Sequence, residues 1–221
     1  HTDRTTEYTY NVLGRLTKSV VTDHKKNEEK ITTTYSYDSA GNRTKKVKGE
    51  EETAYTYNGL NQLLKAKTTK GNTVKNDISY EYDVNGNQIK ETDKETGDSV
   101  ENTYDVENRL STATVTKKKS GTSGNETVSL TQENLYNGEG QRIQKKEAGE
   151  VTNYFYEDGM VSYTTGADTG EKLIQNLSGL EDNVIYAEQK VTGKDGTTAS
   201  YQDFLYTKDI QGSTTSVLGK D

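Results

Sequence analysis

The sequence predicts an all-β protein, a meander of repeated β-hairpins that forms a spiralling, strongly twisted sheet. Three observations predict it: a short tyrosine motif returns six times, residues around it alternate with a period of two, and no stretch keeps a helical period. A period of two places side chains i and i+2 on one face of a strand. Because a short unit must bury its apolar face against its neighbours, a recurring motif indicates a repeat protein.

The motif consists of a tyrosine, then Asp or Asn, and a Gly or Asn four positions after the tyrosine. In most copies a second tyrosine stands two residues earlier, as in Tyr35-Ser36-Tyr37. Tyr, Thr, Val and Ile at this spacing favour a strand. The motif tyrosines are Tyr10, Tyr37, Tyr57, Tyr82, Tyr104 and Tyr136.

Each motif strand is followed by the residues of a tight turn. Asp38, Asp83 and Asp105 stand where other copies have Asn, so we interpret these carboxylates as caps of the turn backbone. Gly or Asn ends the turn because both tolerate a positive φ angle. The glycines at this position are Gly14, Gly41, Gly86 and Gly140.

A returning strand is expected after each turn, and a second, variable turn after that strand. The expected returning strands are 15–21, 43–48, 62–68, 88–92, 109–116 and 142–146. The copies also alternate in kind: Tyr10, Tyr57 and Tyr104 have leucine six positions later, whereas Tyr82 and Tyr136 have isoleucine at seven. We expect this leucine or isoleucine to return to the core, and the alternation to reflect two environments along one sheet.

The composition is unusually polar, with 28% hydrophobic and 29% charged residues and a mean hydropathy of −1.04. Such values are typical of disordered chains, but sixteen tyrosines and no proline are not. A tyrosine buries a large ring while its hydroxyl reaches a polar partner. We therefore expect the tyrosine pairs to form the core, as a ladder on one face; the alternative is an exposed aromatic platform that stacks on sugar rings.

The repeats are clear over about 8–160, and 161–221 is expected to add further β-strands. Together they predict a single repeat domain over residues 1–221. No apolar run approaches the roughly 20 residues that span a bilayer. Terminal strands with unpaired edges favour self-association.

No residues combine into a catalytic, cofactor-binding or metal-binding constellation. The chain has two histidines and no cysteine, and the recurrent carboxylates stand at turn positions. His24 lies in a predicted solvated turn. A net charge of −7 disfavours binding to nucleic acid, which needs clustered positive charge. We therefore expect a protein that is not an enzyme and needs no cofactor.

The motif resembles the repeat of the Rhs/YD-repeat family, which includes bacterial Rhs and wall-associated polymorphic toxins, the shell subunits of Tc toxins, and teneurins. The form Tyr-Asp-x-x-Gly-Asn-Arg stands intact at 37–43 and with one change at 82–88, and a shorter form stands at 104–110. The segment 204–213 is similar to the one that precedes the end of the family's common core.

The resemblance implies a secreted or cell-surface protein of the bacterial cell wall. It implies that this chain forms wall of a β-shell enclosing a C-terminal toxin domain, with the other repeats and that toxin domain as its partners. The alternative function is a cell-surface adhesion or glycan-binding module.

Overall fold

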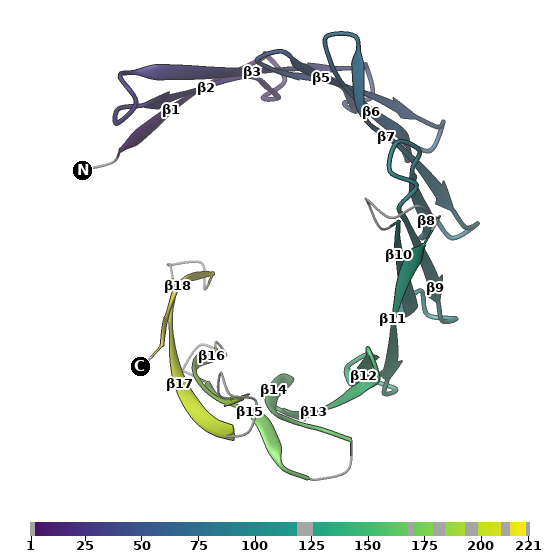
Figure 1. Cartoon of the computed structure of the whole chain (residues 1–221), viewed down its shortest axis with the longest axis vertical. Helices are drawn as coiled ribbons and strands as arrows, with labels where there is room; N and C mark the ends of the chain where they lie inside the picture. The colour runs from purple at the N-terminus through teal and green to yellow at the C-terminus, as the bar shows by residue number, and fades with distance from the viewer. Residues whose placement is uncertain are drawn as a thin grey trace. The chain divides into compact units, whose positions relative to one another are not determined.

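The computed structural model describes residues 3–118, 126–167, 170–178, 184–192, 199–208 and 213–219. All regular secondary structure in these residues is β-strand, and the eighteen strands belong to one sheet (Figure 1). Strands that follow one another along the chain pair antiparallel, which is a hairpin meander. The all-β prediction is therefore confirmed.

The chain divides into two compact units. The first comprises residues 1–108 with 113–129, and the second comprises 109–112 with 130–221. The single domain over 1–221 stays a prediction.

The first unit holds nine whole strands, most of β10 and the beginning of β11. They are β1 (Arg4–Tyr10), β2 (Leu16–Asp23), β3 (Glu29–Tyr37), β4 (Arg43–Lys48), β5 (Glu51–Tyr57), β6 (Leu63–Lys70), β7 (Thr73–Tyr82), β8 (Gln88–Asp93), β9 (Ser99–Tyr104), β10 (Leu110–Lys118) and β11 (Thr127–Tyr136). The predicted returning strand 43–48 matches β4, and the other five predicted returning strands differ from the observed strands by at most two residues at each end.

The second unit contains the rest of β11, the first residues of β10 and seven further strands. These are β12 (Arg142–Glu147), β13 (Glu150–Glu157), β14 (Met160–Thr165), β15 (Lys172–Ser178), β16 (Val184–Thr192), β17 (Ala199–Lys208) and β18 (Thr214–Gly219). The expected strands after residue 160 are thus present. Of the segment 204–213, residues 209–212 lie outside the described residues.

In each motif turn, the amide of the fourth residue after the tyrosine donates to the carbonyl of the first. In the second copy, the Gly41 amide donates to the Asp38 carbonyl and the Asp38 amide to the Asn42 carbonyl. Gly41 has φ +99°, a left-handed conformation that favours glycine. Asn61 and Asn108, at the same position in other copies, also have positive φ. A register shift directly precedes five of the motif tyrosines, for example between Ser36 and Tyr37.

The two faces of the first unit's sheet differ in chemistry. Residues that oppose each other on paired strands share a face. Lys46 opposes Tyr35, and Thr53 opposes Lys46, so both lie on the face that holds the motif tyrosines. The opposite face holds cross-strand ion pairs, in which Lys45 lies 2.6 Å from Glu52 and Lys65 lies 2.8 Å from Asp77. The sheet therefore has an aromatic face and a charged face.

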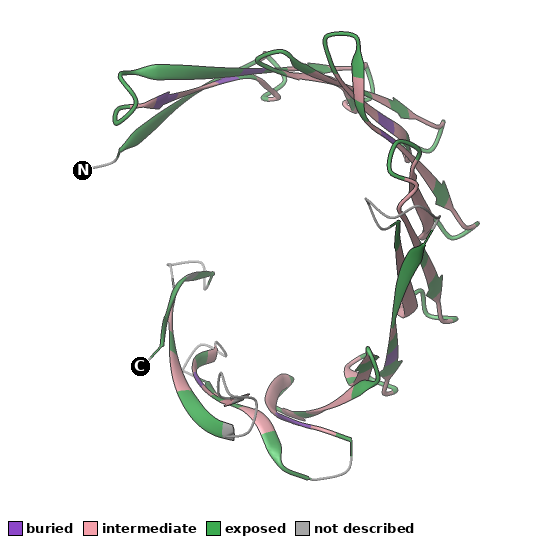
Figure 2. Ribbon diagram, viewed as in Figure 1, coloured by how far each residue is buried: buried purple, intermediate pink, exposed green. Residues whose placement is uncertain are grey.

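The described residues enclose almost no hydrophobic core, because Ala66 and Ala187 are their only buried apolar side chains. Figure 2 shows the buried residues as isolated spots within half-buried strands. Tyr37 and Tyr57 are half-buried as well, and Ile143 is 39% exposed, so its predicted return to a core is wrong. A single sheet layer cannot enclose a side chain from both sides, which limits burial to the contact between neighbouring strands.

Candidate functional site

The recurrent residues form one extended structure along the sheet, which joins each hairpin to the next. Its central feature is a hydrogen bond from a tyrosine hydroxyl to the backbone of the preceding hairpin. The carbonyl always belongs to the residue six positions after the previous motif tyrosine. The six bonds, of 2.7 to 3.0 Å, are Tyr37 to Leu16, Tyr57 to Arg43, Tyr82 to Leu63, Tyr104 to Gln88, Tyr136 to Leu110 and Tyr156 to Arg142.

We call these six donors, Tyr37, Tyr57, Tyr82, Tyr104, Tyr136 and Tyr156, the tyrosine ladder. Burial raises the pKa of Tyr57, of Tyr82 and of Tyr156, so these hydroxyls remain protonated donors at neutral pH. Tyr10 is the exception among the motif tyrosines, since its side chain is 57% exposed and has no such partner in the described residues.

Where the first tyrosine of a pair is absent, an asparagine at its position donates a second hydrogen bond to the same carbonyl. Asn102 stands two residues before Tyr104 and donates to the same Gln88 carbonyl, at 3.0 Å. Asn134 stands two residues before Tyr136 and donates to the same Leu110 carbonyl, at 3.1 Å. Asn102 and Asn134 were not among the residues predicted from the sequence, although both stand two positions before a motif tyrosine.

The aromatic rings of neighbouring hairpins are joined through arginine. The Arg43 guanidinium lies 5.8 Å from the ring centre of Tyr35 and 4.9 Å from that of Tyr55. Arg15 lies over Tyr37, Arg109 over Tyr136, and Arg142 over Tyr154. This cation–π geometry differs from the expected ladder of stacked rings, because the returning strand lies between two tyrosine strands and contributes the intervening side chain.

The carboxylates at the start of the turns act within their own turns. Asp38 accepts hydrogen bonds from the Asn42 amide, at 2.8 Å, and from its side-chain nitrogen, at 3.0 Å. Asp83 has the same bonds with Asn87. The side-chain bond from Asn42 holds the pKa of Asp38 below its ordinary value, and the bond from Asn87 does the same for the pKa of Asp83. Asp105 Oδ1 accepts from the Glu107 amide.

The alternation of the copies is explained by contacts from one turn to the next. In one kind, Asn at the fifth position after the tyrosine donates to Asn at the fourth position of the following turn. Asn42 donates to Asn61 and Asn87 donates to Asn108, each at 2.8 Å. In the other kind, a longer side chain reaches over the glycine of the following turn.

Arg15 shows the second kind of contact most closely. Its Nη1 donates to the Asp38 carbonyl at 3.1 Å, and a Cβ on Gly41 would lie 2.8 Å from its Nη2. Gln62 stands in the same relation to Gly86, at 3.3 Å, and Arg109 to Gly140, at 4.0 Å. Arg109 also donates to the Asn137 carbonyl at 3.1 Å. The glycine at the fourth position thus makes room for the preceding hairpin.

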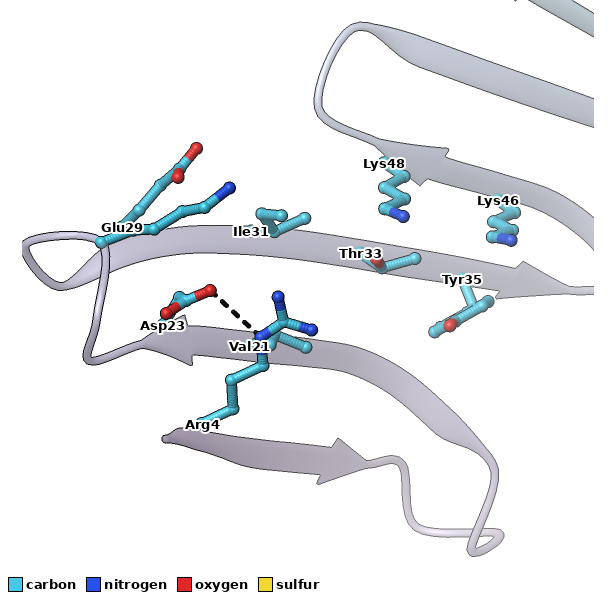
Figure 3. A pocket seen from close by; sticks show the side chains of 10 residues that line it. Arg4, Val21, Asp23, Glu29, Ile31, Thr33, Tyr35, Lys46 and Lys48 are labelled. Atoms are coloured by element: carbon cyan, nitrogen blue, oxygen red, sulfur yellow. Dashed lines mark hydrogen bonds and ion pairs between the residues drawn. The ribbon is translucent and has the colours of Figure 1, made fainter. Parts of the chain in front are cut away.

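A groove of about 420 Å³ lies at one end of the aromatic face, across β1 to β4 (Figure 3). Ile31, Thr33 and Tyr35 of β3 line it, and Lys46 and Lys48 of β4 project over it. At its far side Arg4 Nε donates to Asp23 at 3.1 Å. The groove therefore combines one aromatic ring with several charged side chains.

No cluster of three or more His, Cys, Asp or Glu side chains that could hold a metal occurs in the described residues. His24 lies in its turn and contacts Glu28 at 2.9 Å. In the described part of the chain no helix is long and apolar enough to cross a membrane.

In the second unit, other polar contacts join the strands. Asn176 donates to the Val161 carbonyl at 2.8 Å, and Tyr201 donates to the Lys172 carbonyl at 3.0 Å. Tyr186 donates to Asp203 at 2.6 Å, and this bond raises the pKa of Tyr186 to about 12. Side-chain bonds to the backbone of other strands thus continue beyond the six motif copies.

Comparison with known proteins relates part of the chain to large bacterial nucleases. Over 161 residues, 70% of the chain, it is 33% identical to the tRNA nuclease WapA of Bacillus subtilis (strain 168). It matches the tRNA3(Ser)-specific nuclease WapA of Bacillus spizizenii with the same identity and coverage. The chain spans about 6% of the length of these relatives. No family model matches the chain.

Proposed function

We propose that this chain is a non-enzymatic structural segment of a secreted or wall-associated bacterial protein of the Rhs/YD-repeat family. In this proposal it forms part of the wall of a spiralling β-shell that encloses a C-terminal toxin domain. The tyrosine motif and the similarity to WapA over 70% of the chain support the family. The nuclease activity named for WapA would belong to a part of such proteins outside this stretch.

The observation that carries the proposal is the repeated use of the motif's tyrosine, arginine and asparagine side chains to join hairpins. The tyrosine hydroxyls bond to the preceding hairpin, the arginines lie between rings, and the fifth residues of the turns bridge to the next turn. Among the described residues, no recurrent side chains gather into a cluster that could hold a metal. The recurrent side chains contact neighbouring hairpins. This favours a structural wall over a catalytic or ligand-binding surface.

The single-layer sheet is consistent with a wall. Its charged face carries cross-strand pairs such as Lys90 with Glu101, at 2.7 Å, which suit contact with water. Its aromatic face is half-buried by its own neighbours rather than by a second layer. A single-layer sheet with two different faces can separate two compartments.

Limited proteolysis of the parent protein tests the proposal. We expect its C-terminal domain to resist protease in the whole protein and to be cut rapidly when expressed alone. The double variant Tyr57→Ala, Tyr82→Ala removes two ladder bonds and should make the domain accessible. Val84→Ala, in an exposed turn, is the matched control and should change nothing. A C-terminal domain that is cut equally fast in the whole protein would overturn the wall function.

Glycan binding is the second candidate, and the groove beside Tyr35 is the observation that favours it. A sugar ring could stack on the Tyr35 ring while Lys46 and Lys48 contact acidic substituents. The Arg43 guanidinium already faces this ring, however, and that contact favours the structural role. Binding on a glycan array that disappears with Tyr35→Ala and persists with Tyr37→Phe would support the adhesion function.

A further inference from the structure

Three Asn-Gly pairs occur in the chain, and all three lie in motif turns. Asn58-Gly59 and Asn137-Gly138 begin their turns, whereas Asn85-Gly86 ends its turn. Asparagine is among the thermolabile residues of proteins, and a following glycine leaves its own backbone nitrogen unhindered because it has no Cβ. These pairs are therefore the candidates for a spontaneous reaction between an asparagine side chain and the backbone.

The turn geometry holds the side chains of Asn58 and Asn137 in caps. The Asn58 Oδ1 accepts from the amides of Leu60, at 2.9 Å, and Gln62, at 3.0 Å, and its Nδ2 donates to Gln62 Oε1 at 2.6 Å. Asn137 makes the same three bonds within its own turn, at 2.9 to 3.0 Å. Both residues are half-buried. Each side chain must leave three hydrogen bonds before its Cγ can move to the nitrogen of the next residue.

Asn85 stands at the third position after its motif tyrosine, where another residue supplies the cap. The Asp83 Oδ1 accepts from the amides of Asn85, at 2.9 Å, and Asn87, at 2.8 Å. The Asn85 side chain is exposed and has no hydrogen-bond partner among the described residues. The nitrogen that it must reach, that of Gly86, donates to the Asp83 carbonyl at 3.1 Å. One hydrogen bond therefore opposes the reaction at Asn85, compared with three at each cap.

We propose that Asn85 is a site of spontaneous modification to aspartate and isoaspartate, and that Asn58 and Asn137 are protected by their caps. The Gly86 backbone nitrogen loses its proton and attacks Cγ of Asn85. A carbon–nitrogen bond forms, the Cγ–Nδ2 bond breaks, and ammonia leaves with the displaced proton, so that a cyclic succinimide remains. Water then adds to one of the two ring carbonyls, and the bond from that carbon to the nitrogen breaks as the nitrogen regains a proton. Opening at Cγ gives aspartate, and opening at the main-chain carbonyl gives isoaspartate.

The two products differ in their effect on the hairpin. Aspartate keeps the length of the backbone and adds one negative charge. Isoaspartate routes the chain through the side-chain carbon, which adds one atom to the backbone between Asp83 and Gly86 and disturbs the bond between them. The same turn positions Asn87, whose side chain donates to Asn108 of the next motif turn at 2.8 Å. Isoaspartate at this position therefore weakens a contact between hairpins.

Because the reaction needs only water, incubation of the whole chain at mildly alkaline pH tests the proposal. Peptide mapping by mass spectrometry gives the rate of acid formation at each Asn-Gly pair, in the folded chain and in concentrated urea. In urea we expect similar rates at the three pairs, because the hydrogen bonds of the turns are absent there.

In the folded chain we expect Asn85 to convert at least tenfold faster than Asn58 and Asn137. Each cap is protected by two more hydrogen bonds than Asn85, and one bond slows the reaction about fivefold. Equal rates at the three pairs of the folded chain, or faster conversion at either cap than at Asn85, would overturn the proposal.

The variant Gln141→Ala tests the protection by the cap directly. It removes the acceptor of the Asn137 Nδ2, so Asn137 should convert about fivefold faster. Asn85, in a different turn, is the internal control and should keep its rate. Circular dichroism shows whether the variant is folded, and an unchanged rate at Asn137 in the folded variant contradicts protection by the cap. The comparison of the original chain with and without urea decides the proposal even if the variant does not fold.

Discussion

A hydroxyl group distinguishes tyrosine from phenylalanine, and in this chain that group joins neighbouring hairpins. Six tyrosine hydroxyls donate to carbonyls of the preceding hairpin, and two asparagines reach the same kind of carbonyl where the partner tyrosine is absent. The ring contributes partial burial, and the hydroxyl satisfies a backbone group at the end of a strand pairing. This explains why the chain uses sixteen tyrosines and only two phenylalanines.

Removing a single ladder hydroxyl should therefore reduce stability measurably. We expect Tyr37→Phe and Tyr82→Phe each to lower the free energy of unfolding by about 1 kcal/mol, the typical net value of one hydrogen bond. Tyr10→Phe is the matched control, because the Tyr10 hydroxyl has no partner in the described residues. Urea denaturation followed by circular dichroism measures all three, and a cost for Tyr10→Phe equal to the others would contradict the role of the ladder.

The turn carboxylates predict a specific response to acid. The folded pKa of Asp38 and of Asp83 is lowered, first by the side-chain bond from Asn42 or Asn87. Their contribution is thus complete above the unfolded value near 3.8 and is lost as pH falls through the lower folded value. The variant Asp38→Asn, Asp83→Asn should show a shallower loss of stability below about pH 4. Denaturation at stepped pH tests this, and an unchanged slope would refute it.

At the scale of the hairpin, the turn is where one element recognises the next. Two arrangements alternate: an asparagine pair, and an Arg or Gln side chain lying over a glycine. Two constraints therefore act on the fourth residue of each turn: it must tolerate a positive φ, and it must fit the side chain that reaches it from the preceding hairpin. The alternation of the motif copies is a consequence of these two ways of packing.

A pair of alanine substitutions separates the two demands on the turn glycine. Gly41→Ala and Gly14→Ala both place a Cβ at positive φ, which costs about 1 to 2 kcal/mol. At Gly41 the methyl group also displaces Arg15 from the Asp38 carbonyl, whereas Gly14 has open space. We expect the loss of stability to be larger at Gly41 by about 1 kcal/mol. Equal losses, measured by urea denaturation, would mean that Arg15 contributes nothing.

At the scale of the whole chain, stability comes from contacts between neighbours and not from a central core. The accessible surface is 15297 Å², whereas a compact protein of 24.6 kDa exposes roughly 10,000 Å². Two alanines are the buried apolar side chains of the described residues. Energetically the sheet resembles a repeat array, in which each unit contacts only the next.

Loss of a terminal hairpin should therefore leave the following strands folded. We expect a chain that begins at Glu29, without β1 and β2, to keep the exchange protection of β5 to β9. Protection of β3 should fall, because β3 becomes the edge and Tyr37 loses the Leu16 carbonyl. Hydrogen exchange measures both effects, and cooperative loss of protection throughout β3 to β9 would show that the unit behaves as one core.

The sequence by itself determined the local structure. The strand 43–48 and the turn at 38–41 follow from patterns that act over a few residues: alternation, a capping Asp and a glycine at positive φ. The ends of strands were predicted less well, because the pairing that extends β6 beyond Thr68 to Lys70 depends on β5 and β7.

Only the tertiary structure decided what the recurrent side chains contact. The carbonyl that accepts from Tyr82 is nineteen residues away, and Arg43 lies between rings of two different strands. The absence of an enclosed core among the described residues also depends on packing. The sequence pattern of a tyrosine pair is the same whether the sheet forms one layer or packs against a second. Sequence spacing fixes which face of a strand a side chain occupies, but its partner is fixed by the register and twist that bring distant strands together.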